Sequence, residues 1–225
     1  MSIRRKGACM RYKNILWDWN GTILDDTPVA FEATNILLEK YGYPVITLEY
    51  YRDNMDTPVE NFYRKIFDLS RHGMQMLDEE WGVLYHQLSY KITLHEGVEN
   101  LLRHFKQENC HQVVLSAFRT EEITNYARRF SIESFFECIL GTQNIVMESK
   151  TMRGRAYMQE NRYLPEQTLY IGDTVHDYET ALALGVDCVL FSGGQQSPRV
   201  LRQCGVPVCD RFESLEKSLL MGCVS

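Results

Sequence analysis

The sequence has no long hydrophobic run, no excess of basic residues and no closely paired cysteines, and each absence excludes a class of protein. No apolar stretch reaches the roughly 18 residues that a membrane span needs, so we expect no membrane partner. The formal net charge is -6, whereas nucleic-acid-binding domains usually carry a basic surface, so we expect no nucleic-acid partner. The seven cysteines include no C-x-x-C pair, and scattered thiols are typical of a reducing compartment, which predicts a cytoplasmic protein.

The chain of 225 residues can form one large domain or a core with a smaller companion. Residues 1–12 are rich in lysine and arginine but lack the apolar core of a secretory signal, so we expect a flexible N-terminal extension. No patch long enough to indicate an interface between copies is visible, and a monomer is the default expectation.

Short apolar stretches alternate with amphipathic ones along most of the chain. The apolar stretches are typical of buried strands and comprise residues 14–19, 113–116, 138–140, 169–171 and 188–191. The amphipathic stretches are typical of helices and comprise residues 96–108, 121–130, 151–161 and 177–184. Such alternation predicts an α/β protein with a Rossmann-like, doubly wound parallel sheet that helices cover on both faces.

Residues 27–93 depart from this alternation. Their apolar residues recur at helical spacing and no strand pattern appears. Aromatic residues at this spacing, such as Tyr63, Trp81 and Tyr85, are better explained by core packing than by substrate stacking. We therefore predict an α-helical cap domain at 27–93, inserted into a core formed by residues 13–26 and 94–225.

Polar side chains stand where the predicted strands end. Asp18 ends the first strand, Ser116 the second, and Lys150 opens the helix after the third. Asp173 and Asp177 follow the fourth strand. In open α/β sheets, ligands bind at the carboxyl ends of the strands, near the point where strand order reverses. We therefore expect these five side chains to share one site.

These residue types suit the transfer of a phosphoryl group. A carboxylate attacks a phosphate ester only when a cation and hydrogen-bond donors offset the charge repulsion, and Asp18 is the natural nucleophile, forming an aspartyl-phosphate. Asp18 and Asp173 offer the hard oxygen ligands that Mg²⁺ prefers. Ser116 would donate a hydrogen bond to a phosphoryl oxygen, and the positive charge of Lys150 would keep Asp18 ionised.

In this order the motifs resemble those of the haloacid dehalogenase superfamily, in particular its phosphoglycolate phosphatase and β-phosphoglucomutase-like branch, which carries a helical cap after the first motif. The family pattern D-x-D-G-T corresponds to Asp18-Trp19-Asn20-Gly21-Thr22, and G-D-x-x-x-D corresponds to Gly172, Asp173 and Asp177. The resemblance implies a hydrolase acting on a small phosphorylated molecule.

The resemblance also implies roles for individual residues. Asp18, the main-chain carbonyl of Asn20 and Asp173 would hold Mg²⁺, and Asp177 would ligate it through water or orient Lys150. Ser116, Ala117 and Lys150 would bind the phosphoryl group. Arg52 in the cap and Arg119, three residues after Ser116, are the cations expected to meet a carboxylate or second phosphate of the substrate.

Asn20 stands where the family has its second aspartate, which in its phosphatases protonates the leaving alcohol and activates water. An amide cannot exchange protons near neutral pH, and such acid–base help is worth about 10²–10⁴ in rate. The chain would then be a slow phosphatase or one whose substrates have good leaving groups. Alternatives are a phosphonate-cleaving enzyme, which needs a cap lysine (Lys40, Lys65 or Lys91), a catalytically impaired phosphate-binding or regulatory protein, or an enzyme in which His176 or Asp177 replaces the aspartate.

Overall fold

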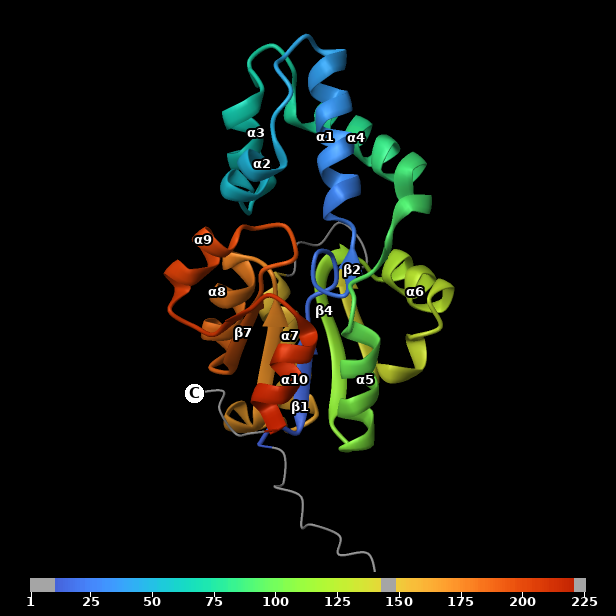
Figure 1. Ribbon diagram of the computed structural model, residues 1–225, viewed down its shortest axis with the longest axis vertical. Helices are drawn as coiled ribbons and strands as arrows, with labels where there is room; N and C mark the ends of the chain where they lie inside the picture. Colours follow the sequence, from blue (N-terminus) through green and yellow to red (C-terminus); the bar gives the residue numbers. More distant parts are fainter. Residues whose placement is uncertain (1–10, 143–148, 221–225) are drawn as a thin grey trace, which may run out of the picture.

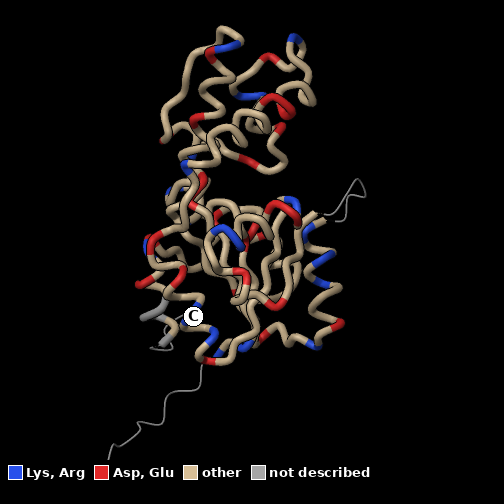
Figure 2. The backbone as a smooth tube through the Cα atoms, turned by 90° about the vertical axis from the view of Figure 1, so that its right-hand side faces the viewer, with Lys and Arg blue, Asp and Glu red and all other residues tan. Residues whose placement is uncertain are grey.

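The structure is a computed structural model that describes residues 11–142 and 149–220. The described residues form two structural parts. A parallel sheet with helices on both faces forms one part, and four helices form the other (Figure 1). Seen from the side, acidic and basic residues are interspersed over both parts (Figure 2). Within the described ranges, no helix has the length and apolarity needed to cross a membrane.

Six parallel strands form the sheet, in the order β5-β4-β1-β6-β7-β8. Their bounds are β1 (Asn14–Trp17), β4 (His111–Arg119), β5 (Cys138–Thr142), β6 (Thr168–Gly172), β7 (Asp187–Phe191) and β8 (Val208–Cys209). The chain places β4 and β5 on one side of β1 and β6, β7 and β8 on the other, so strand order reverses at β1. The predicted doubly wound α/β fold is confirmed, with β8 as an edge strand that the sequence did not indicate.

Helices cover both faces of the sheet. One face packs against α5 (Val98–Gln107), α6 (Thr120–Arg129) and α10 (Phe212–Leu220), and the other against α7 (Lys150–Glu160), α8 (Val175–Leu184) and α9 (Pro198–Leu201). Because side chains alternate along a strand, Ile15 and Trp17 of β1 join the first layer and Leu16 joins the second. Burial on both faces explains why the strands read as continuous apolar runs.

Four helices lie between β2 (Leu24–Asp25) and β3 (Thr93–Leu94): α1 (Thr27–Lys40), α2 (Leu48–Asn54), α3 (Val59–Ile66) and α4 (Met74–Leu88). We call them the helical part. Pro28 lies in the first turn of α1, where its fixed φ suits the helix. β2 and β3 pair in antiparallel fashion, so the two connections to the sheet run side by side.

The packed chain begins before residue 13. The ring of Tyr12 is 2% exposed, and its hydroxyl donates a hydrogen bond of 2.8 Å to Asp187. A ring that is buried while its hydroxyl keeps a partner belongs to the core, so the predicted extension of residues 1–12 does not include Tyr12. Residues 1–10 lie outside the described part of the chain.

We expect Phe105→Ala to lower the free energy of unfolding by about 3–5 kcal/mol, because it opens a cavity beside Trp17. The Phe105 side chain is fully buried and meets Trp17 edge to face, with ring centroids 5.9 Å apart. Tyr90→Ala is the control, since Tyr90 is 70% exposed and its loss should cost less than about 0.5 kcal/mol. Urea denaturation measures both, and equal effects would contradict the assignment of this core.

Candidate active site

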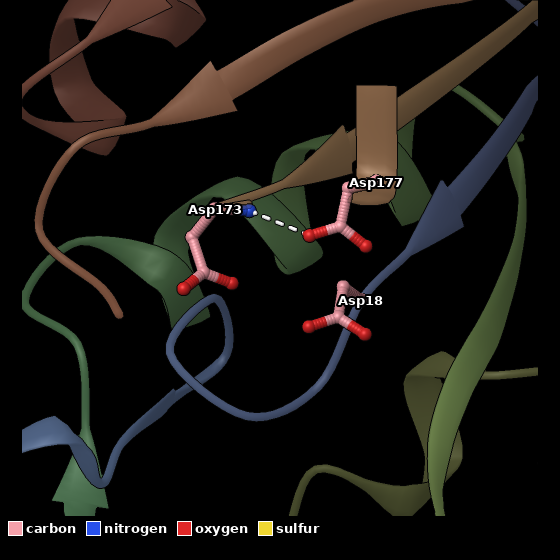
Figure 3. Close-up of side chains that lie close together, drawn as sticks. All are labelled: Asp18, Asp173 and Asp177. Carbon is pink, nitrogen blue, oxygen red and sulfur yellow. Dashed lines mark hydrogen bonds between the residues drawn. The ribbon is translucent and has the colours of Figure 1, made fainter. Parts of the chain in front are cut away.

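Three buried carboxylates gather at the carboxyl edge of the sheet. Asp18 follows β1, Asp173 follows β6, and Asp177 lies in the first turn of α8 (Figure 3). One oxygen of each lies within 4.8 Å of the others. The structure therefore brings Asp18 together with two carboxylates that follow it by 155 and 159 residues in the chain. Parallel strands make this possible because their carboxyl ends meet at the same edge.

Lys150 bridges two of these carboxylates. Its Nζ donates to Asp18 Oδ1 and to Asp177 Oδ1, each at 2.6 Å. Burial lowers the pKa of Lys150, but the charges of Asp177 and Asp18 outweigh burial and raise it overall. Burial and the charge of Asp177 raise the pKa of Asp18, and Lys150 opposes them. The site thus contains an ammonium group held against the carboxylate of Asp18.

The neighbouring arginines of α7 lie elsewhere. Arg153 donates to the carbonyl of Ser116 at 2.6 Å, and Arg155 donates to the carbonyl of Ala183 at 2.7 Å. Lys150 is therefore the basic side chain of α7 that reaches the carboxylates. It can do so because Ser149 caps the helix through its side chain and places Lys150 at the first helical position, facing the sheet.

Asp177 uses both oxygens within the protein. Oδ1 accepts from Lys150 and from the Tyr170 hydroxyl at 3.2 Å. Oδ2 accepts from the main-chain N–H groups of Asp173 and Thr174, at 3.1 and 3.0 Å. Because these bonds fix the loop that carries Asp173 and also hold Lys150, the geometry favours an orienting role for Asp177.

Asp173 is fully buried and accepts from the Thr22 hydroxyl and the Gln195 N–H, each at 2.7 Å. Burial, followed by the charges of Asp18 and Asp177, raises its pKa well above the usual value. The backbone closes tightly here, since a Cβ on Gly194 would lie 2.2 Å from Asp173 Oδ2. Crowded, buried carboxylate oxygens are a donor set that suits Mg²⁺, which prefers oxygen ligands and offsets their charge.

Ser116 and Ala117 lie in the last part of β4, where the pairing with β5 shifts register between Leu115 and Arg119. Bulges of this kind redirect side chains and often lie beside active sites. Ser116 is 3% exposed, and its Oγ accepts from the N–H of Phe118 at 3.1 Å. The hydroxyl proton of Ser116 remains available for a donated hydrogen bond.

The Asn20 side chain is held by two groups that the sequence analysis did not select. Its Nδ2 donates to Asp26 Oδ2 at 2.7 Å and to the Tyr85 hydroxyl at 3.2 Å. Asp26 is 1% exposed and also accepts from Tyr85 and from the N–H of Gly21, each at 2.7 Å. Burial raises the pKa of Asp26, and the three donors oppose that shift. The amide at position 20 thus supplies a hydrogen-bond donor to a buried carboxyl group.

A cavity of about 370 Å³ lies over these residues, between the carboxyl edge of the sheet and the helical part. Asp18, Asn20, Ser116, Ala117, Lys150 and Asp177 all line it. The aromatic residues Tyr51, Tyr63, Trp81 and Tyr85 line it as well, so aromatic side chains expected only to pack the core also form a wall of the cavity.

Arg52 and Arg119 are not among the lining residues. The guanidinium group of Arg52 donates to the carbonyls of Ser192 and Gln196, which ties α2 to the loop after β7. Arg119 is exposed at the end of β4. The structure therefore does not bring either predicted cation to the cavity.

Several residues of the site gave weak signals in the sequence. Asp26 precedes Thr27 and Pro28, and it reads as a helix N-cap rather than as a partner of Asn20. Gln195 follows Gly193 and Gly194 directly after a strand, a position at which a ligand-binding loop is common. Thr22 and Tyr85 act through contacts that only the folded chain creates.

Comparison with known families agrees with this geometry. Residues 15–191 match the family model of haloacid dehalogenase-like hydrolases. The chain belongs to this family.

The relatives of this hydrolase are distant in sequence. Phosphoglycolate phosphatase from Pseudomonas putida is 22% identical over 196 residues, covering 82% of this chain and 71% of the relative. A haloacid dehalogenase-like hydrolase from Streptococcus pneumoniae has the same fold, with a TM-score of 0.79, 19% identity, and coverage of 92% of this chain and 98% of that one. A predicted phosphatase from Clostridium acetobutylicum matches with a TM-score of 0.77 and 20% identity, covering 93% and 99% of the two chains.

We expect Mg²⁺ to stabilise the hydrolase more at about pH 8 than at about pH 5. The pKa of Asp173 is raised in the folded chain, so without a cation the folded state loses stability as pH rises above the ordinary value of 3.8. A bound cation favours the ionised form and offsets this loss. Saturating Mg²⁺ should raise Tm by roughly 5–10 °C at the higher pH. Differential scanning calorimetry with Mg²⁺ or EDTA measures the shift, and one that shrinks with rising pH would contradict the prediction.

Gly194→Ala should weaken Mg²⁺ binding by at least roughly tenfold, because disturbed support of metal ligands commonly costs that much. The added methyl group would collide with Asp173 Oδ2 and with the carbonyl of Gly21. Gly82→Ala in α4 is the control, since nothing lies within 4 Å of its Cβ position. Isothermal titration calorimetry compares the two variants, and unchanged affinity in Gly194→Ala would show that Asp173 does not bind the ion.

Proposed function

We propose that this hydrolase is a magnesium-dependent phosphatase that cleaves a small phosphorylated molecule through an aspartyl-phosphate on Asp18. The observation that carries the proposal is the ammonium group of Lys150, 2.6 Å from Asp18 Oδ1, at the floor of the cavity. The phosphoglycolate phosphatases among the relatives support the same class of reaction.

Asp18 would act as the nucleophile. A carboxylate oxygen forms a bond to phosphorus while the bond from phosphorus to the leaving oxygen breaks, and the leaving group departs with the electron pair. Lys150 favours the ionised form of Asp18 and offsets the charge of the incoming phosphoryl group. Ser116 donates a hydrogen bond from its hydroxyl group to a phosphoryl oxygen. Water then cleaves the aspartyl-phosphate, releasing phosphate and the Asp18 carboxylate.

Asp18, the main-chain carbonyl of Asn20 and Asp173 would hold Mg²⁺. When bound, the ion would neutralise charge on the phosphoryl oxygens. Asp177 orients Lys150 and the loop of Asp173 through the bonds described above.

Asn20 itself cannot give the departing oxygen a proton, and His176, the alternative acid, also lines the cavity. The Nδ2 group of Asn20 already donates hydrogen bonds to Asp26 and Tyr85, and an amide does not release a proton near neutral pH. An aspartate at position 20 would set two carboxylate oxygens at hydrogen-bond distance, which requires a proton between them. The buried carboxyl group of Asp26 therefore explains why an amide, and not a second carboxylate, is favoured at position 20.

The phosphonate-cleaving alternative lacks a lysine in the right place. Lys40 pairs with Glu80, Lys65 donates to the carbonyl of Asn54, and Lys91 pairs with Glu32. None of these three lines the cavity, so a Schiff base with a bound substrate would require the helical part to be rearranged.

We further propose that residues 27–93 act as a cap on a core of residues 13–26 and 94–225. The contacts that would hold the cap closed join α2 to the loop after β7 and to the start of α9. Ser197 and Arg199 bind Asp53, and the Tyr51 hydroxyl donates to Gln195 Oε1 at 2.8 Å. The paired strands β2 and β3 would serve as the hinge.

Asp18→Asn should lower kcat/KM for phosphomonoesters by a factor of at least about 10³, because the amide is a poor nucleophile. Asp68→Asn, an exposed aspartate outside the cavity, is the matched control and should keep full activity. Phosphate release in the presence of Mg²⁺ measures both. Background turnover in the wild type would contradict the phosphatase and leave a phosphate-binding protein.

The four combinations of Asn20→Asp and Asp26→Asn test the pairing. The double variant keeps one carboxyl and one amide group, and we expect it to raise kcat/KM for alkyl phosphates by roughly 10²–10⁴ over the wild type. Asn20→Asp alone should gain less at neutral pH because its two carboxyl groups share a proton, and Asp26→Asn alone should gain nothing. Additive effects of the two substitutions would contradict direct coupling between these positions.

A further inference from the structure

The walls of the cavity are mostly aromatic and apolar. They comprise Ala30, Tyr51, Met55, Val59, Tyr63, Trp81, Tyr85 and Phe118. Trp81 and Tyr85 are stacked, with ring centroids 5.0 Å apart and planes 23° apart, and the Tyr85 ring meets Phe118 edge to face at 6.2 Å. An aromatic or apolar group of the ligand that moves from water into this space is therefore stabilised by the hydrophobic effect.

Positive charge is scarce in the cavity. Among the described residues that line it, Lys150 is the only lysine or arginine, and Asp18 and Asp177 already neutralise it. Two arginines of the helical part bind elsewhere: Arg52 donates to carbonyls of the core, and Arg64 pairs with Glu60 on the surface. A carboxylate or second phosphate on the leaving group would therefore meet no further lysine or arginine here, and among the lining residues only the His176 imidazole could add a positive charge.

The charge at the outer end of the cavity is negative. Asp78, an exposed residue in the first turns of α4, is among the lining residues and lies near the Tyr63 ring. A carboxylate at this position favours a cationic or hydrogen-bond-donating group and disfavours an anionic one. It lies on α4 about two helical turns, roughly 10 Å, before Tyr85, the residue of the aromatic wall that binds Asn20 and Asp26.

The chemistry at Asn20 points the same way. Because Asn20 gives the leaving oxygen no proton, the barrier to its departure rises as the alcohol becomes less acidic. A phenol such as tyrosine has a pKa of about 10, whereas water, with an acidity close to that of simple alcohols, is a far weaker acid. Phosphate esters of phenols therefore depend less than those of simple alcohols on a general acid, which Asn20 cannot supply.

We propose that the substrates are phosphate monoesters of phenols or of comparably acidic hydroxyl groups on an aromatic frame, with a cationic or donor group at the far end. This inference rests on the proposed phosphatase function and adds the chemical class of the leaving group. The aromatic wall holds the ring, Asp78 meets its far end, and the phosphoryl group lies at Asp18 and Lys150. Glycolate-like leaving groups, which are small and anionic, fit none of these features.

Four probes separate the features in a steady-state assay with Mg²⁺: phenyl phosphate, O-phosphotyramine, 2-phenylethyl phosphate and phosphoglycolate. Phenyl phosphate should exceed 2-phenylethyl phosphate in kcat/KM by roughly 10²–10⁴, the usual worth of a missing general acid. The Asn20→Asp/Asp26→Asn variant should reduce that ratio. Phosphoglycolate should be the poorest of the four, and its being the best would overturn the inference.

Asp78→Asn tests the outer end. It should lower kcat/KM for O-phosphotyramine by roughly two- to fivefold, the scale of a partly exposed charge pair, and leave phenyl phosphate unchanged. Glu79→Gln is the matched control, an exposed acid on the same helix that does not line the cavity. Equal losses on both substrates, or equal losses in both variants, would remove Asp78 from substrate recognition.

Binding separates this inference from the phosphatase function itself. With Asp18→Asn, whose turnover should be at least about 10³ slower, calorimetric titration in Mg²⁺ should rank O-phosphotyramine and phenyl phosphate above phosphoglycolate. If this order holds while the wild type hydrolyses none of the probes, the ligand class stands and the phosphatase function fails. If phosphoglycolate binds most tightly, the inference fails even if the wild type is an active phosphatase.

Discussion

The contact of Lys150 with Asp18 and Asp177 is the interaction on which the site depends. Three carboxylates within 4.8 Å of one another, all buried, would repel each other strongly without a nearby positive charge. The ammonium group makes this concentration of charge tolerable, and its two bonds of 2.6 Å fix where the nucleophile and the α8 turn lie. Removing one member would leave a buried charge without a partner, which is the costly case for an ion pair.

A second electrostatic constraint links the two parts of the molecule. Asp26 stands at the start of α1, and Tyr85 reaches it from α4, while Asn20 and Gly21 approach from the loop after β1. The carboxyl group requires donors on every side because it has left water. The residue type at position 20 is therefore constrained by its hydrogen bond to Asp26 as well as by the chemistry of the phosphoryl group. The amide, which looks like a loss when the sequence motif is considered alone, is the better partner once Asp26 is present.

The helical part is also coupled to the acidic site through the loop after β7. Gln195 donates its N–H to Asp173 and accepts from the Tyr51 hydroxyl of α2, at 2.7 and 2.8 Å. Gln195, which lines the cavity, thus joins Tyr51 of the helical part to the buried carboxylate of Asp173. Arg52 of α2 donates to the carbonyls of this loop. Because Arg52 is used there, α2 contributes the aromatic ring of Tyr51 to the cavity and no cation.

The sequence alone determined the fold class and the order of the polar groups, because both are local. Buried parallel strands read as short apolar runs, and a polar residue at the end of such a run must lie at the ligand-binding edge of the sheet. Asp18, Ser116, Lys150 and Asp173 could be selected on that basis. The short strands β2, β3 and β8, with two residues each, carry no such pattern and were missed.

Only the tertiary structure decided what surrounds these groups. Whether Arg52 faces the substrate or a backbone carbonyl depends on how α2 lies against a loop about 140 residues later in the chain. The partnership of Asn20, Asp26 and Tyr85 depends likewise on contacts across 6 and 59 residues. Local patterns report burial and chain direction, whereas the pairing of distant polar groups follows from packing in three dimensions, and that pairing decides how the motif residues are used.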